Sequence, residues 1–193
     1  DEGVIPGVEA ENCCVIEVGG ELWVATVSQG VFRVTRPAGD RDWRRAEASR
    51  KGPADGLPEK HGAIYLSATG LGLLFDTADG IYRFDTADGR FSIYPELTAF
   101  DQRKVVLNPL VAGGGGEVWT NGILMTKEIP YPVLRLRRGE SGTVSAEPAP
   151  PAISGLFNPS GAHRMFHEVG PSGGGVLWAK GEFSLVRVDL SRG

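Results

Sequence analysis

Short apolar runs separated by turn residues dominate residues 72–94 of the chain. The tetrapeptide Thr-Ala-Asp-Gly occurs at 77–80 and again at 86–89, on either side of the run Ile-Tyr-Arg-Phe at 81–84. Asp-Gly favours tight hairpin turns, because Gly adopts positive φ without a Cβ clash and Asp hydrogen-bonds its own backbone. The β-branched and aromatic residues between the turns favour strands. The pattern therefore predicts three antiparallel strands joined as a meander, over the runs LLFDT, IYRF and RFSIY.

The same pattern of apolar strand, Gly-rich turn and second apolar strand occurs four times along the chain. The copies cover residues 13–34, 63–84, 105–120 and 165–190, and each has an apolar pair after its turn: Leu22-Trp23, Leu73-Leu74, Val118-Trp119 and Leu177-Trp178. A strand of the type VFRV, IYRF or LVRV follows in the first, second and fourth copies, and PVLRLRR at 132–138 supplies it in the third. The apolar pairs recur about every 50 residues, which is typical of β-propeller blades with four strands each.

A fourth, outer strand can be placed after three of the copies. Its expected positions are DWRRAEA at 42–48, RFSIYPE at 90–96 and TVSAEPA at 143–149. The sequence thus predicts an all-β fold, a β-propeller of four-stranded antiparallel blades, as a single propeller domain or fragment over residues 1–193. The expected blades cover residues 12–58, 62–100, 103–150 and 162–193.

The two ends of the chain bear on how many blades the whole ring has. The sequence stops at RVDLSRG, where the outer strand of the fourth blade should begin, and residues 1–12 have no strand pattern that could complete it. We therefore expect a section of a larger propeller, in which about four of the blades are present. The alternative is a closed four-bladed ring. Residue 1 is Asp rather than Met, which indicates a processed product or an excised piece.

Three of the four tryptophans occupy equivalent positions of the repeat. Trp23, Trp119 and Trp178 each follow the Gly-rich turn by a few residues, whereas Trp43 lies outside this register. Large aromatic side chains at repeated positions are suited to packing between neighbouring blades. We expect these three residues to be buried in the core.

The stretch GGELWVATVSQGVFRV, residues 19–34, resembles the two-component regulator propeller repeat, with its Gly, Leu-Trp, small residue, Thr, Gly, hydrophobic pair and Arg. The connector DGLP at 55–58 is also typical of that family. The resemblance extends over residues 12–190 with uneven strength: Leu74 replaces the Trp in the second copy, and Ala179-Lys180 replaces the small residue and Thr in the fourth.

This resemblance implies an extracytoplasmic, for example periplasmic, ligand-sensing region of a two-component signalling protein, which works by binding rather than catalysis. Members of the family often respond to carbohydrate-type cues. The implied partners are a small-molecule or carbohydrate-type ligand and the remaining blades and signalling domains of the parent protein. Any histidine kinase activity and any membrane-spanning segment would belong to that parent.

Composition and charge exclude some other classes. The chain has 193 residues, 41% of them hydrophobic and 23% charged, which is ordinary for a soluble globular protein. The 28 glycines and 13 prolines favour many turns and therefore many short strands. The net charge of −4 argues against a nucleic-acid groove as the main site. No apolar run approaches the roughly 20 residues of a membrane helix.

The two cysteines, Cys13 and Cys14, are adjacent in the sequence. Neighbouring strand residues point to opposite faces, so a disulfide between them is geometrically awkward. Two cysteines without a metal-ligand spacing fit no zinc site. We expect two small buried hydrophobic residues, with a strained redox pair as the alternative.

His163 and His167 are four residues apart, and Glu168 follows directly. Positions i and i+4 lie on roughly one side of a helix or strand, so a metal pair is conceivable, but no third ligand is evident. We instead predict that His167 and Glu168 contact a ligand as polar residues at the mouth of the propeller channel. The sequence predicts no catalytic residue, no metal and no cofactor.

Three other motifs are best explained as turns or surface. GPSGG at 170–174 matches the G-x-S-x-G nucleophile elbow, but it falls on a hairpin turn rather than between a strand and a helix. The runs GGGG at 113–116 and GGG at 173–175 lead into strands and lack the Lys-Ser/Thr of a phosphate loop. The basic segment 40–51 contains three acidic residues that dilute its charge, so it is predicted to be a solvated outer strand.

Two alternatives from other functional classes remain open: a propeller-fold carbohydrate-active enzyme, such as a glycosidase or lyase, and a secreted interaction scaffold. The enzyme would need convergent carboxylates at one face. The chain has 24 acidic residues, but most lie in turns, as Asp79 and Asp88 do, and no pair stands out. The Asp box of sialidase-like propellers is missing from the turns before the tryptophans.

Overall fold

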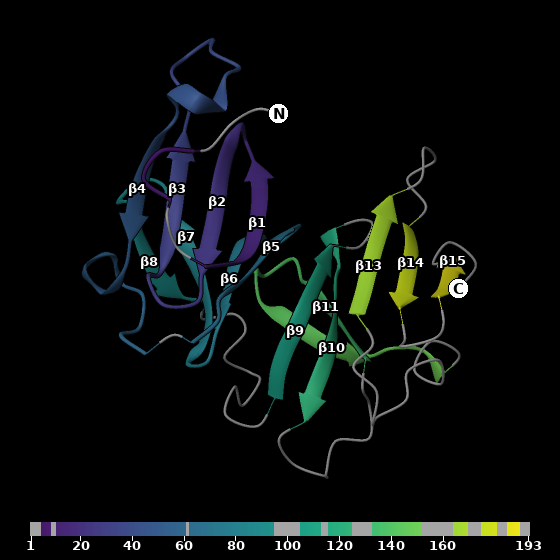
Figure 1. The fold of residues 1–193 in the computed structure, drawn as a ribbon. Coiled ribbons are helices and arrows are strands. Elements are labelled where there is room, and N and C mark those ends of the chain that lie inside the picture. Colours follow the sequence, from purple (N-terminus) through teal and green to yellow (C-terminus); the bar gives the residue numbers. More distant parts are fainter. Residues whose placement is uncertain are drawn as a thin grey trace. The chain divides into compact units, whose positions relative to one another are not determined.

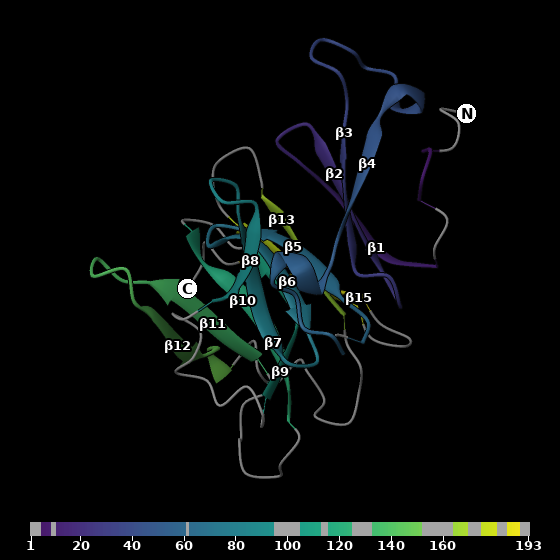
Figure 2. The same cartoon turned by 90° about the vertical axis from the view of Figure 1, so that its left-hand side faces the viewer.

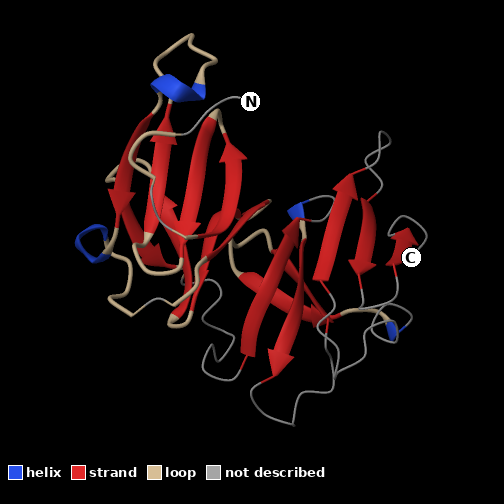
Figure 3. Ribbon diagram, in the orientation of Figure 1, coloured by secondary structure: helices blue, strands red, loops and turns tan. Residues whose placement is uncertain are grey.

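The computed structural model shows an all-β chain of antiparallel sheets (Figures 1 and 3). The structure describes residues 5–8, 11–60, 62–94, 105–112, 116–124, 133–151, 164–169, 175–180 and 185–189. Their strands pair in sequence order into four sheets, and helical structure within them is limited to short turns. No helix among these residues is long and apolar enough to cross a membrane.

The first and second sheets have four strands each, in the order of the sequence. The first sheet comprises β1 (Asn12–Val18), β2 (Glu21–Thr26), β3 (Val31–Thr35) and β4 (Glu47–Lys51). The second comprises β5 (Tyr65–Thr69), β6 (Gly72–Thr77), β7 (Gly80–Asp85) and β8 (Arg90–Ile93). The last three of these strands confirm the meander predicted from the repeated Thr-Ala-Asp-Gly turns.

The third sheet again has four strands, whereas the fourth has three. The third comprises β9 (Val105–Ala112), β10 (Val118–Leu124), β11 (Val133–Arg138) and β12 (Val144–Pro148). The fourth comprises β13 (Arg164–Val169), β14 (Gly175–Lys180) and β15 (Leu185–Asp189). The sheets are separate and none closes on itself, so the arrangement of blades into a ring stays a prediction.

The outer strand of the first sheet differs from the prediction. A strand was expected over 42–48, but Trp43–Arg45 form a 3₁₀ turn and β4 begins only at Glu47. The Asp42 carboxylate caps this turn by accepting a hydrogen bond from the backbone N–H of Arg44 at 3.0 Å. Asp side chains compete in this way with strand pairing, because they offer the backbone a local partner. The 3₁₀ turn is coloured as helix in Figure 3.

The chain divides into two compact units, one formed by residues 1–66 with 73–94 and the other by 67–72 with 95–193. In the first unit the first and second sheets pack face to face. Trp23 contacts two rings of the second sheet edge-on, with centroid distances of 5.4 Å to Phe75 and 4.9 Å to Phe84. Phe91 continues the cluster at 4.8 Å from Phe75. Trp23 is 2% exposed, which confirms its predicted place in the core.

The first and second sheets have equivalent strands that can be aligned residue by residue. Thr26 and Thr77 each donate a side-chain hydrogen bond of 2.8 Å to a glycine carbonyl in the following turn, Gly30 and Gly80. The two threonines are therefore equivalent, and the strands can be aligned from them. In this alignment the pairs are Trp23 with Leu74, Val24 with Phe75, Ala25 with Asp76, Phe32 with Tyr82, and Val34 with Phe84. Figure 2 shows the first sheet nearly edge-on.

The second unit contains the third and fourth sheets, in which β13 lies beside β9 (Figure 1). Trp119 is 2% exposed and thus buried as predicted. The other buried apolar residues of the third sheet are Leu110, Val118, Leu134, Leu136 and Val144. The side chain of Trp178 is outside what the structure describes, so its predicted core position stays a prediction.

The adjacent cysteines lie on the first strand of the first sheet. Cys14 is a half-buried free thiol whose Sγ lies 3.7 Å from the carbonyl oxygen of Leu66. It packs against the cluster around Trp23, as expected for a small apolar residue. The strand pairing is irregular between Asn12 and Cys14, and the side chain of Cys13 is outside the described part.

Gly56, in the connector between the first two sheets, lies directly against the backbone of Phe91. Gly56 follows the 3₁₀ turn Pro53–Asp55 and has φ of 101°. A Cβ at this position would collide with the backbone carbonyl oxygen of Phe91. The DGLP connector is therefore fixed against the outer strand of the second sheet by a residue without a side chain.

We expect Gly56→Ala to lower the free energy of unfolding by about 3 kcal/mol, because backbone strain and a backbone collision add. Gly39→Ala is the matched control: Gly39 also has positive φ, 81°, but its Cβ would meet nothing within 4 Å. That variant should lose only about 1 kcal/mol. Urea unfolding followed by far-UV circular dichroism measures both, and equal losses would show that the approach to Phe91 is not tight.

Candidate functional site

The predicted ligand residues His167 and Glu168 lie on β13, the first strand of the fourth sheet. Their backbones pair with Leu177 and Val176 of β14. Their side chains are outside what the structure describes, and so is the whole of His163. Within the described residues no group of three His, Cys, Asp or Glu side chains could hold a metal ion.

The structure adds a feature that the sequence analysis did not single out: an arginine faces the key apolar position across the strand pair in every sheet. The registers pair Trp23 with Arg33, Leu74 with Arg83, Trp119 with Arg135, and Trp178 with Arg187. Where the side chains are described, the guanidinium lies near the indole, 5.7 Å from the Trp23 ring for Arg33 and 5.9 Å from the Trp119 ring for Arg135. The arginine in the motif VFRV is thus the partner of the tryptophan.

An acidic residue two positions before each of these two tryptophans holds the arginine. Glu21 accepts two hydrogen bonds from Arg33, of 2.8 and 2.6 Å. The hydrogen bond to Glu21 raises the pKa of Arg33. Glu117 stands at the equivalent position in the third sheet, 3.8 Å from Arg135. Since these charges are already paired, the Glu-x-Trp and Arg units serve packing between strands rather than ligand binding.

A second group in the third sheet completes the same pattern of paired charges. Arg135 also donates a 2.7 Å hydrogen bond to Glu147, and this bond lowers the pKa of the Glu147 carboxyl. Arg137 pairs with Glu117 at 2.7 Å. These residues lie on the neighbouring strands β11 and β12 and on the residue before β10. This group of charges has a structural role, because both of its acidic residues, Glu117 and Glu147, pair with arginines.

The basic segment 40–51 is likewise neutralised by its own acidic residues. Arg44 donates to both oxygens of Asp42 at 2.8 to 3.1 Å, and Arg45 lies 3.5 Å from Asp40. The hydrogen bond from the Arg44 side chain is the main reason that the pKa of Asp42 falls to about 2. The surface is solvated as predicted, although its first half is a turn rather than a strand. The glycine motifs at 170–174, 173–175 and 113–116 lie outside the described residues except for Gly175 and Gly116.

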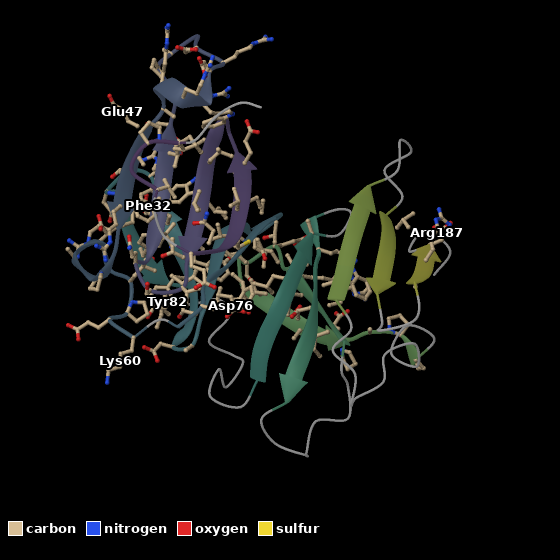
Figure 4. All side chains as sticks on the ribbon, in the orientation of Figure 1. Phe32, Glu47, Lys60, Asp76, Tyr82 and Arg187 are labelled. Atoms are coloured by element: carbon tan, nitrogen blue, oxygen red, sulfur yellow. The ribbon has the colours of Figure 1, made fainter. Side chains whose placement is uncertain are left out.

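Asp76 is a buried acidic residue on the second sheet and is labelled in Figure 4. It lies on β6 opposite Ile81, is 7% exposed, and its Oδ2 atom is buried with no hydrogen-bond partner among the described residues. Burial disfavours the charged carboxylate and raises the pKa of Asp76 to about 7. The equivalent residue of the first sheet is Ala25, which needs no partner. Asp76 can therefore gain and lose a proton near neutral pH.

Sequence reasoning missed Asp76 because it was counted only as the end of the strand LLFDT. One signal was available: an acidic residue inside an apolar run, one residue before a turn threonine, where the first copy has alanine. Its burial depends on what covers the sheet face, which a single sequence does not contain.

Comparisons with protein-family models and with curated proteins find no match to this chain. Among solved structures, the extracellular domain of a protein assigned as a hybrid two-component system from B. thetaiotaomicron matches with a TM-score of 0.52 and 15% sequence identity, covering 95% of this chain and 30% of that chain. An extracellular domain assigned as a one-component system from the same organism gives a TM-score of 0.49 at 15% identity, with the same coverages. The first likeness shows a shared fold, and the chain spans 30% of that structure's length.

Proposed function

We propose that this chain is a section of a β-propeller from the extracytoplasmic sensor region of a two-component signalling protein, and that it binds a ligand rather than catalysing a reaction. The observation that carries the proposal is the fold shared, over 95% of the chain, with an extracellular domain assigned as a hybrid two-component system. The resemblance of residues 19–34 to the two-component regulator propeller repeat points the same way.

The repeated build of the sheets supports the propeller part of the proposal. Sheets of three or four antiparallel strands follow one another along the chain, each with the same cross-strand apolar–Arg pair. In the first unit, the tryptophan-bearing face of one sheet packs on the next sheet. A single sheet of this kind exposes apolar surface that a neighbouring sheet must cover. This is the reason that propeller blades occur in rings.

The sensing part of the proposal rests on differential binding. A ligand changes the population of two arrangements of a receptor only by binding one of them more tightly. His167 and Glu168, on the first strand of the fourth sheet, are the proposed contacts for a carbohydrate-type ligand. Signal transmission would be the work of the remaining blades and the signalling domains of a longer parent protein.

We expect one or more members of a panel of neutral and acidic oligosaccharides to bind the chain without being cleaved. His167→Ala and Glu168→Gln should each weaken that binding about tenfold, because a hydrogen bond involving a charged group contributes on the order of 1.5–3 kcal/mol. Glu47→Gln, an exposed position on β4, is the control and should bind normally. Calorimetry measures the affinity, and chromatography of the sugars detects cleavage.

One outcome would contradict the proposal itself, and another would contradict the proposed ligand contacts. Turnover of a sugar that disappears when one pair of carboxylates is replaced would make the chain an enzyme. Binding that is unchanged in both His167→Ala and Glu168→Gln would leave the sensing role standing but place the ligand elsewhere on the molecule.

A further inference from the structure

We draw no further inference here: the strongest candidate, the Asp76 carboxyl on the face of the second sheet that also carries Leu74 and Ile81, belongs to the site already described, and the chain itself buries all three residues.

Discussion

Asp76→Asn should raise the free energy of unfolding at pH 8 by about 4 kcal/mol. The folded protein holds the Asp76 proton up to a pKa of about 7, whereas the ordinary value is 3.8. Each pKa unit corresponds to about 1.4 kcal/mol. A buried carboxylate whose Oδ2 has no hydrogen-bond partner among the described residues therefore destabilises the folded protein at alkaline pH, and an uncharged amide of the same shape removes that cost.

The pH dependence has a definite sign. Between pH 3.8 and about 7 the folded state binds more protons than the unfolded chain at Asp76, so stability falls as the pH rises through this window. Above pH 7 the loss is complete, and below pH 3.8 it is absent. In Asp76→Asn this component of the pH profile should disappear, and the two proteins should be equally stable near pH 4.

Urea unfolding at a series of pH values measures the effect, and Asp88→Asn is the matched control. Asp88 lies in the exposed Thr-Ala-Asp-Gly turn, where its side chain accepts a hydrogen bond of 2.9 Å from the backbone N–H of Arg90. Asn can accept the same bond, so we expect a change below about 0.5 kcal/mol. An Asp76→Asn protein that is less stable at pH 8 than the unsubstituted chain would show that the carboxylate has a stabilising partner.

Trp23→Ala should lower the free energy of unfolding by about 3–5 kcal/mol, the usual cost of removing a buried Trp. Trp23 fills the space between the first two sheets and also carries the Arg33 guanidinium against its ring. Since single domains are stable by about 5–15 kcal/mol, this loss is a large part of the total stability. Far-UV circular dichroism in urea measures the loss independently of indole fluorescence.

Trp23→Leu tests whether a smaller apolar side chain can fill the same position. Leu74 occupies the equivalent position in the second sheet, so leucine is compatible with the strand and should cost less, about 1–3 kcal/mol. Val15→Ala on β1 is the control, because Val15 is 54% exposed and should change stability by less than about 0.5 kcal/mol. A Trp23→Ala protein as stable as Val15→Ala would mean that the two sheets do not pack through this residue.

Strand positions could be predicted from the sequence because they depend on local chemistry. The Asp-Gly turns and the β-branched and aromatic residues between them fix β6, β7 and β8, and the repeated Trp position marks a buried residue on β2 and on β10. The first outer strand was misplaced by a local effect too, since the cap supplied by Asp42 outweighed the strand propensity of residues 43–45.

The chemistry of single side chains was harder to predict, because it depends on contacts between distant segments. The burial of Asp76 follows from what covers one face of the second sheet, and the pairing of Arg33 with Glu21 follows from the register of β2 and β3. Neither is visible in a single sequence without the strand pairing. The predicted ligand residues His167 and Glu168 are placed on a strand, but their contacts remain to be measured.

A crystal structure of this chain tests the central claim most directly. If the chain is a propeller section, its four sheets will be arranged radially about one axis, with β1, β5, β9 and β13 nearest to that axis. Sheets paired instead as two independent sandwiches, without a common axis, would contradict the propeller and with it the proposed sensor role.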